Sequence, residues 1–479
     1  MSLREVLRHA RYDADGVLER IGELGQEGLQ RNITVPATVA LAGQHDELAT
    51  LIRLFILQEE VGMEEAAFLL DDAADFLEQT EHGVRALVDI RPYGSEDDGA
   101  SGWAVADLTP GMDTATTPTR RDYVLGVSSA STTLAQMTMR TQIGSALDLG
   151  TGCGVQSLHL SRHAERVVAT DVNARALKLA RVTAELSGAE VDFRQGSLFE
   201  PVQGEKFDLI VSNPPYVMSP PSDSRLMYRE TNFSGDELLQ AILREAPRHL
   251  NPGGSIQLLV NWAVVDGQPW EERIRGWVEG NGMDLFVLER ERMDKFSYIE
   301  LWLADAGLAG SEEWVYAYDR WLKYFEDLGI EEVGMGWLLM TDAGRATPHV
   351  RIESWPHAVH QPVGEVFARH RSAVDAATLP LDDLLASRPR IVDVTQETFG
   401  EPGAADPEYI VLRQSTGLRR AMKVDTVLAA VLGSLDGDLT VGQVIAAVAE
   451  LLEKDPTALS LEIAPKVREA LEEQYLRLD

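Results

Sequence analysis

A glycine-rich turn between a predicted strand and a predicted helix constrains the fold of this chain more than any other feature. The turn, Asp148-Leu149-Gly150-Thr151-Gly152-Cys153-Gly154, follows an apolar run at residues 146–149 and precedes a helix-like segment at residues 155–164. Glycines here allow the backbone to approach a ligand closely and let the helix pack against the strand. We therefore expect a nucleotide-type ligand at the carboxyl end of a strand in an α/β sheet.

A second motif, Asn213-Pro214-Pro215-Tyr216, follows the apolar run at residues 207–211. Proline lacks the ladder donor and restrains its neighbour, so the strand must end there. The Asn213 side-chain oxygen and the Pro214 carbonyl could accept the two hydrogens of a planar NH2 group, and Tyr216 could pack against its plane. We predict these three residues as the catalytic ones. A tight turn alone would explain the prolines but not their neighbours.

A carboxylate in the right place strengthens the case for an adenosine-type ligand. Asp171 ends a second predicted strand and lies 21 residues after Gly150, where an acid can hold the two hydroxyls of a ribose. Dinucleotide and sulfonium cofactors both fit this spacing. Asp148 would repel a pyrophosphate but could hold the ammonium group of an amino acid, so a cofactor with an α-amino acid part is favoured over NAD.

Strands and helices alternate through the middle of the chain, which predicts a mainly parallel sheet of seven strands in an α/β domain at residues 118–354. The expected strands are residues 146–149, 166–170, 191–194, 207–211, 255–261, 283–289 and 336–340. A turn at residues 251–254 precedes the fifth, and a helix is expected at residues 174–186. An insertion at about residues 294–330 carries aromatic residues at helical spacing, which favours packing on the sheet over a lid that grips the substrate.

Two further domains are expected on either side. Residues 1–117 should form a domain that is helical to about residue 80, followed by a β-hairpin of residues 84–92 and 103–108 with a solvated acidic tip. Residues 355–479 should form a winged-helix-like α+β domain, with strands at residues 409–414 and 418–424 followed by three helices. Thr440 and Gln443 have the spacing of a capping box.

The distribution of charge argues against a long nucleic-acid footprint. Residues 121–262 contain 13 Lys plus Arg and 15 Asp plus Glu, so nearly all of the net charge of −34 lies in the flanks. Proteins that follow phosphates need a basic surface, although a local basic groove could escape this count. The acidity could serve solubility, or it could form a face for a basic partner.

Other candidate sites are weaker. Cys153, the one cysteine, excludes internal disulfides and fits a reducing cytoplasm, where we expect the protein to act. His159 and His163 have no third ligand spaced with them, so we expect packing or surface roles and no metal site. No apolar run is long enough to span a membrane and no signal-peptide core begins the chain.

The combination of motifs resembles the class I S-adenosylmethionine-dependent N-methyltransferases, most closely the HemK/PrmC-like branch, over about residues 118–262. The resemblance is carried by Asp148 to Gly154, Asp171, Gly196-Ser197-Leu198-Phe199, Asn213 to Tyr216, Gly235-Asp236-Glu237-Leu238 and Asn251-Pro252-Gly253-Gly254. It implies a Rossmann-like methyltransferase sheet and S-adenosylmethionine as the cofactor. The cofactor-binding residues would be Asp148, Gly150, Thr151, Gly152, Gly154, Asp171, Val172, Ser197, Leu198 and Asn213.

The implied reaction is methylation of a planar NH2 nitrogen, with a protein side-chain amide of the glutamine type as the first choice. An exocyclic amine of an RNA or DNA base is the alternative, and an inactive methyltransferase-like binding module is a third. Ser197 stands where the family usually has an aspartate. Ser129 to Thr133 takes the place of an upstream family motif. The hydroxyl side chains of the segment Ser128 to Thr133 could cap a helix and line the pocket, or serve as caps only.

Overall fold

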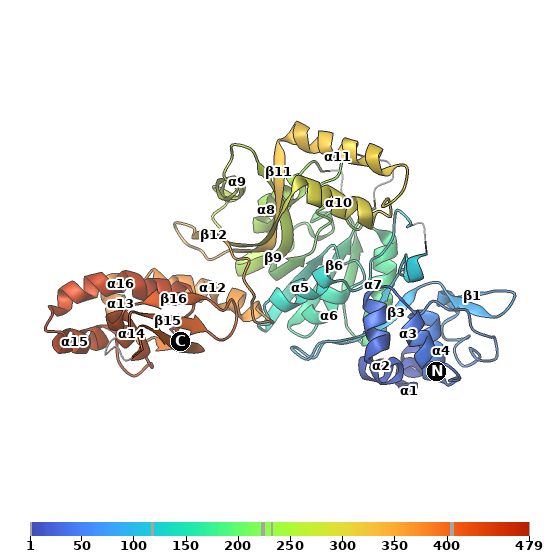
Figure 1. The fold of residues 1–479 in the computed structure, drawn as a ribbon, viewed down its shortest axis with the longest axis horizontal. Coiled ribbons are helices and arrows are strands. Elements are labelled where there is room, and N and C mark those ends of the chain that lie inside the picture. Colours follow the sequence, from blue (N-terminus) through green and yellow to red (C-terminus); the bar gives the residue numbers. More distant parts are fainter. Residues whose placement is uncertain (1, 116–118, 222–225, 231–232, 403–406, 479) are drawn as a thin grey trace. The chain divides into compact units, whose positions relative to one another are not determined.

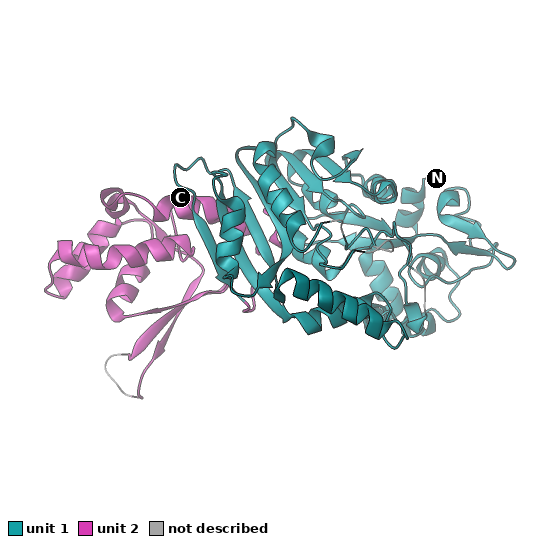
Figure 2. Ribbon diagram, turned by 90° about the horizontal axis from the view of Figure 1, so that it is seen from above, with its two compact units in different colours: residues 1–135, 142–355 teal, residues 136–141, 356–479 magenta. Residues whose placement is uncertain are grey.

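The computed structural model describes residues 2–115, 119–221, 226–230, 233–402 and 407–478. The chain forms two compact units (Figure 2), one made of residues 1–135 and 142–355 and the other of residues 136–141 and 356–479. The second unit begins close to the predicted start of the C-terminal domain. The first unit contains the predicted N-terminal domain and the predicted central domain apart from residues 136–141, and the boundary between the two domains stays a prediction.

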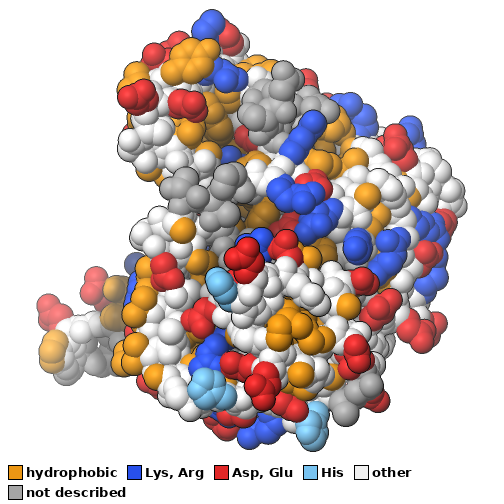
Figure 3. All heavy atoms as spheres, turned by 90° about the vertical axis from the view of Figure 1, so that its right-hand side faces the viewer, with side chains coloured by type: hydrophobic (Ala, Val, Ile, Leu, Met, Phe, Trp, Pro, Cys, Tyr) orange, Lys and Arg blue, Asp and Glu red, His pale blue; other side chains and the backbone are white. Residues whose placement is uncertain are grey.

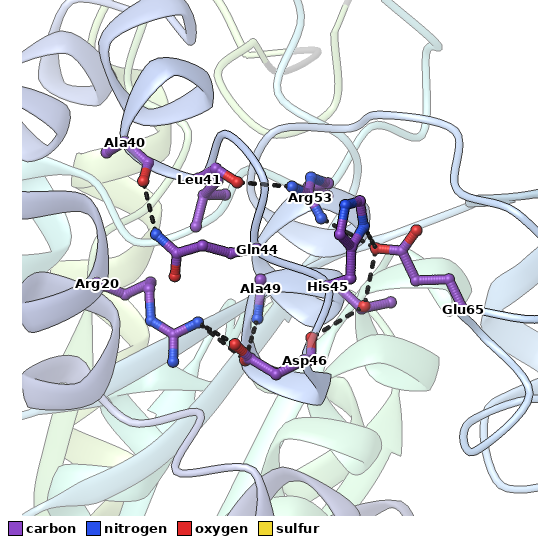
Figure 4. Close-up of polar contacts among 10 residues, drawn as sticks. Arg20, Ala40, Leu41, Gln44, His45, Asp46, Ala49, Arg53 and Glu65 are labelled. Carbon is purple, nitrogen blue, oxygen red and sulfur yellow. Dashed lines mark hydrogen bonds and ion pairs between the residues drawn. The ribbon is translucent and has the colours of Figure 1, made fainter.

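Four helices begin the chain, namely α1 (Leu3–His9), α2 (Ala14–Gln30), α3 (Val35–Ala40) and α4 (Glu47–Phe55). The prediction that the chain is helical to about residue 80 is wrong beyond Phe55, where turns lead to the short strands β1 (Leu77–Gln79) and β2 (Val84–Ala86). Like charges four residues apart, as at Glu60 and Glu64, disfavour a helix in this acidic segment. Figure 4 shows how polar contacts join the helices, since Asp46 caps α4 and also pairs with Arg20 of α2 at 2.6 Å.

The predicted hairpin is present as strands β3 (Asp89–Gly94) and β4 (Ser101–Ala106), which pair in antiparallel fashion, but the predicted first strand at residues 84–92 is divided between β2 and β3. Two short hydrogen bonds join the hairpin to Tyr12, which lies between α1 and α2. The Tyr12 hydroxyl donates to the Ile90 carbonyl at 2.6 Å, and Trp103 Nε1 donates to the Tyr12 carbonyl at 2.6 Å. Because Tyr12 is fully buried, both bonds lie in the apolar core of this region.

An eight-stranded sheet forms the centre of the first unit (Figure 1), with the order β12-β10-β11-β9-β8-β5-β6-β7. Its strands are β5 (Ile143–Leu149), β6 (Ala164–Asp171), β7 (Asp192–Gln195), β8 (Phe207–Ser212), β9 (Leu250–Val265), β10 (Asp284–Asp294), β11 (Ile330–Thr341) and β12 (Val350–Ser354). All neighbours are parallel except that β11 runs antiparallel to β9 and β10. The α/β prediction is confirmed.

The predicted number of seven strands is corrected to eight. The missed strand, β12, is short, alternates charged with apolar residues and lies half-buried at the edge, so it lacks the apolar run of the other strands. The predicted turn at residues 251–254 lies inside β9 as an irregularity, because Phe207 pairs with Leu250 but Leu209 pairs with Ser255.

The helices that accompany the sheet are α5 (Ser129–Met137), α6 (Val155–Leu160), α7 (Ala174–Ser187), α8 (Glu237–Glu245) and α9 (Trp270–Val278). The predicted helix at residues 174–186 is confirmed as α7, which begins where the Asn173 side chain accepts from the Arg175 amide at 2.9 Å. Helix α6 is shorter than the predicted 155–164, because its C-cap is Ser161 and β6 begins at Ala164.

The predicted insertion contains α10 (Lys295–Asp305) and α11 (Trp314–Leu328), and packing is its main role. Trp321 and Phe325 are buried in a cluster with residues of β9, β11 and α10. Tyr316 points away from this cluster and is 71% exposed. The same cluster includes Val217 and Met218, so the insertion also contacts the segment directly after Asn213-Pro214-Pro215-Tyr216.

The second unit has its own apolar core. Its helices are α12 (Gly364–Ala377), α13 (Leu381–Ala386), α14 (Thr426–Gly433), α15 (Val441–Leu451) and α16 (Pro456–Glu472), and its strands are β13 (Arg390–Ile391), β14 (Val394–Phe399), β15 (Tyr409–Gln414), β16 (Ala421–Val424) and β17 (Leu476–Arg477). The predicted strand pair is confirmed as β15 and β16, and the capping box at Thr440 and Gln443 is present. The winged-helix assignment stays a prediction. No helix in the described parts of the chain is both long and apolar enough to cross a membrane.

Candidate functional site

A cavity of about 470 Å³ lies at the carboxyl ends of β5, β6 and β8 in the first unit. It brings together most of the residues predicted from the sequence. Those that line it are Asp148, Gly150, Thr151, Gly152, Asp171, Val172, Ser197, Leu198, Asn213 and Pro214. Gly154 and Tyr216 are not among the lining residues. Tyr216 instead borders a small neighbouring recess together with Pro214 and Asn261.

The glycine turn after β5 has the conformation that its residue types require. Gly152 has a φ of +55°, and a Cβ added there would meet no atom within 4 Å, so this glycine leaves open space at the cavity wall. Gly154 has a φ of +86°, and its added Cβ would lie 3.1 Å from Ala180 Cβ of α7. Gly152 therefore leaves room for a ligand at the cavity wall, whereas the absence of a side chain at Gly154 allows the close packing of α6 against α7.

The carboxylate of Asp148 lines the cavity and is buried, because only 1% of the residue is exposed. Its Oδ2 accepts hydrogen bonds from Thr151 Oγ1 at 2.7 Å and from Ser157 Oγ at 2.6 Å. Burial raises the pKa of Asp148 to about 6, although these two bonds act in the opposite direction. Both bonds go to one oxygen, so Oδ1 can accept from a cationic donor in the cavity, whose charge would restore the ionised form.

Asp171 is the last residue of β6, and its carboxylate connects the glycine turn with the start of α7. Its Oδ2 accepts from the Gly152 amide at 3.0 Å, and its Oδ1 accepts from the Asn173 amide at 2.8 Å. Burial raises the pKa of Asp171. Each carboxylate oxygen can accept a further bond, so this side chain can take the two hydroxyls of a ribose without breaking either amide contact.

Asn213, directly after β8, has a buried side-chain oxygen with no hydrogen-bond partner. Buried acceptors without a donor are uncommon and costly, so an exception in a cavity wall marks the place where a ligand donor fits. The strand end is held firmly, since Ser212 Oγ donates to the Leu149 carbonyl of β5 at 2.6 Å. The open acceptor is therefore presented by a fixed backbone.

The segment before β5 contributes residues whose role the sequence left open. Ser128 and Ser131 line the cavity, and Ser128 Oγ also accepts from the Ser131 amide at 3.3 Å, so capping and lining occur together. Tyr123 and Tyr228 were missed. They line the same cavity and meet edge to face, with ring centroids 5.5 Å apart. In the sequence, the only sign that these two tyrosines belong to the site is that each lies near one of the predicted motifs.

The prediction that the acidic hairpin tip is solvated holds for Glu96 and Asp97, which are exposed, but it is wrong for Asp98. The Asp98 side chain is 1% exposed, and its Oδ2 contacts His159 Nδ1 at 2.7 Å and His163 Nε2 at 3.2 Å. The Tyr93 hydroxyl lies 2.6 Å from His159 Nε2. These two histidines hold the pKa of Asp98 well below its usual range. The cluster joins the hairpin to α6, and no group of metal-ligating side chains was found among the described residues.

Two parts of the chain match known protein families. Residues 126–268 match the family described as Methyltransferase small domain, and residues 9–87 match a Domain of unknown function (DUF7059). The release factor glutamine methyltransferase of Xylella fastidiosa is 40% identical over 128 residues, which cover 24% of this chain and 46% of that protein. The ribosomal RNA small subunit methyltransferase C of Salmonella arizonae is 33% identical over 130 residues, with coverage of 27% and 34%. A methyltransferase from Pyrococcus furiosus of known structure aligns at 18% identity and a TM-score of 0.26, over 44% of this chain and 79% of that one.

The chain spans about half the length of the curated relatives it matches. The match agrees with the predicted methyltransferase class of this region, for which S-adenosylmethionine is the expected cofactor, whereas the predicted domain bounds stay a prediction. Residues 126–268 of this chain therefore match the Methyltransferase small domain family, in the part of the chain where the sequence motifs resemble class I methyltransferases.

Proposed function

We propose that this chain transfers a methyl group from S-adenosylmethionine to a planar NH2 nitrogen, and that the nitrogen belongs to a protein side-chain amide of the glutamine type. The observation that carries the proposal is the buried, unpartnered Oδ1 of Asn213 in the cavity wall. An NH2 group satisfies such an acceptor directly. The reaction is proposed to take place in the cytoplasm, whose reducing conditions suit the single cysteine, Cys153.

The residues around the cavity fit the cofactor. Asp148 would hold its ammonium group, and the backbone of Gly150, Thr151 and Gly152 would border its amino-acid part. Asp171 would accept from the ribose hydroxyls. Val172, Ser197 and Leu198 also line the cavity, and they are proposed to border the ribose and adenine. When bound, the sulfonium supplies a methyl group that is already activated for transfer.

The acceptor residues need to align a weak nucleophile more than to activate it. Asn213 Oδ1 and the Pro214 carbonyl would each accept one N–H of the amide, which orients the nitrogen lone pair toward the methyl carbon. In this position the nitrogen would accept the methyl group as its bond to sulfur breaks, and the extra proton of the nitrogen would leave to water. Tyr216 borders the recess beside Pro214 and is proposed to support the loop and the plane of the amide.

The second candidate is a base amine in RNA or DNA. The relative from Salmonella arizonae is named as a ribosomal RNA methyltransferase, which favours this candidate. The charge distribution favours the protein amide, because residues 121–262 are nearly neutral and phosphate contacts require basic side chains. On the face drawn in Figure 3, Lys and Arg side chains gather from the centre toward the right of the view, and acidic side chains are most numerous below them. A methyltransferase-like module without activity is the third candidate.

Labelling identifies the acceptor class. The protein is incubated with methyl-labelled S-adenosylmethionine and a cell extract, and the products are divided between protease and nuclease digestion. Release of the label by protease supports the amide, release by nuclease supports the base amine, and absence of label supports the inactive module.

A paired substitution tests the acceptor residue. Asn213→Ala should abolish transfer while calorimetry still detects cofactor binding. Asn251→Ala is the matched control, because its amide donates to Asp208 at 2.8 Å outside the cavity, and it should keep full activity. Full activity of Asn213→Ala would refute the assigned chemistry.

A further inference from the structure

Helix α10 of the insertion holds the chain directly after the acceptor motif. The Tyr298 hydroxyl is buried and accepts hydrogen bonds from the Met218 amide at 3.2 Å and from Asn261 Nδ2 at 3.1 Å. Met218 lies two residues after Tyr216, and Asn261 of β9 borders the recess that Pro214 and Tyr216 also line. One hydroxyl therefore connects the acceptor loop with the sheet.

The same helix also contacts the far end of the segment that follows the acceptor motif, at Arg229. The Val217 amide donates to the Arg229 carbonyl at 2.9 Å, so the two ends of the loop are joined. The buried Arg229 guanidinium pairs with Asp305 of α10 and lies over the Trp302 ring, 5.7 Å from its centroid. Both ends of the segment after the acceptor motif are thus anchored on α10.

The position of the Tyr298 hydroxyl is fixed by the ring that carries it. The ring packs among Trp302, Trp321 and Phe325, with centroids 6.1, 6.5 and 5.8 Å away, and the residue is completely buried. Removal of the hydroxyl would leave two donors in the protein interior without this acceptor. An amide released in this way gains freedom to move, even when the apolar packing around the ring stays intact.

We propose that Tyr298 is a positioning residue for methyl transfer, which sets the location of the loop Asn213-Pro214-Pro215-Tyr216 through the Met218 amide. This inference rests on the proposed function. Rotation about the proline φ angles is restricted, so a shift of Met218 is passed along the loop to Asn213. Small misplacements of a bound acceptor are costly, and about 1 Å reduces a rate by about 100-fold.

The test compares Tyr298→Phe with Tyr318→Phe. The Tyr318 hydroxyl contacts Glu300 at 3.2 Å on the outside of the same insertion, which makes it a matched control. Two measurements are made on the full chain. Hydrogen exchange follows the Met218 amide, and tritium-labelled S-adenosylmethionine follows transfer to a protein extract at saturating cofactor, with the cofactor Kd determined by calorimetry.

In Tyr298→Phe we expect the Met218 amide to exchange at least tenfold faster and the transfer rate to fall at least tenfold, with the cofactor Kd unchanged within twofold. Tyr318→Phe should match the wild type throughout. A purely structural role would lower the folded fraction, which circular dichroism detects, without this selective loss. If Tyr298→Phe fails to fold, Asp305→Asn, which breaks the second anchor at a half-exposed position, should show the same selective loss of rate.

Unchanged exchange of the Met218 amide, or faster exchange with an unchanged rate, would overturn the inference. Loss of cofactor affinity in parallel with the rate would overturn it as well, because the effect would then lie in the cofactor half of the cavity. A wild-type protein that transfers no label contradicts the proposed function itself. An active wild type together with a fully active Tyr298→Phe contradicts the positioning role alone.

Discussion

Replacement of Asp148 by asparagine should stabilise the cofactor-free protein and weaken its binding of S-adenosylmethionine. The carboxylate is 1% exposed and receives two hydroxyl hydrogen bonds on a single oxygen. Asparagine has the same shape, and its oxygen can accept both bonds while its NH2 group faces the cavity. The substitution thus removes a buried charge and keeps the local contacts.

The magnitude follows from the raised pKa. Burial raises the pKa of Asp148 from 3.8 to about 6, so the folded protein binds the proton more tightly than the unfolded chain does. The stabilising contribution of the neutral acid is fully present below pH 3.8 and is lost as the pH rises through about 6. A difference of about two pKa units corresponds to about 3 kcal/mol in the free energy of unfolding. The wild type loses this stabilisation at pH 7.5, because Asp148 is then ionised. Asparagine avoids this loss at every pH.

The assay can report on the first unit alone. All nine tryptophans of the chain lie within residues 1–135 and 142–355. Urea unfolding followed by tryptophan fluorescence should show Asp148→Asn more stable by about 2–3 kcal/mol at pH 7.5, with a smaller gain at pH 5, where the wild-type acid is itself largely protonated. Loss of a charge-assisted bond should weaken cofactor binding by about 10- to 100-fold in calorimetry.

Asp319→Asn provides the control, because Asp319 is exposed on α11 and the substitution makes the same change in charge. It should change neither stability nor cofactor affinity. If Asp148→Asn were less stable than the wild type at pH 7.5, the buried carboxylate would not be a cost to the folded state. Unchanged cofactor affinity would refute its role as the ammonium partner.

Two further substitutions separate cofactor binding from packing. Asp171→Ala should weaken S-adenosylmethionine binding by about tenfold or more in calorimetry, since a charged acceptor of the ribose hydroxyls is lost; unchanged affinity would contradict the ribose assignment. Asp98→Ala should lower the free energy of unfolding by about 2 kcal/mol in urea, because two buried histidines lose their shared acceptor. Glu96→Ala, on the exposed part of the same tip, is its control, and equal stability of both variants would show that the Asp98 contacts contribute nothing.

The cofactor part of the site could be predicted because it is local in the sequence. The turn after β5, Asp148 and Asp171 lie within 24 residues and contact one another, as the bond from the Gly152 amide to Asp171 shows. Glycine spacing and strand-end acids describe such a structure directly. The sheet was predictable for the same reason, since its apolar strands alternate with helices, apart from the polar edge strand β12.

Contacts between distant segments could not be predicted. Asp98 looks like a solvated loop residue in the sequence, and only the fold of the hairpin onto α6 places it against His159, 61 residues away. Tyr123 and Tyr228 likewise meet only because the chain returns to the cavity mouth after 105 residues. Periodicity describes which face of an element is apolar, but it does not identify the partner of a buried polar group.

The two halves of the cavity differ in where their supports come from. The contacts that hold the turn and Asp171 lie inside residues 126–268, which match the methyltransferase small domain. The contacts that hold the acceptor loop come in part from Tyr298 and Asp305 of α10, which begins at Lys295, beyond the matched region. The proposed cofactor site thus rests on contacts within the region that matches the family, whereas the proposed placement of the acceptor motif also depends on contacts from outside that region. It follows that the acceptor must be identified with the full chain, because a fragment limited to the matched residues would lack both anchors of the loop.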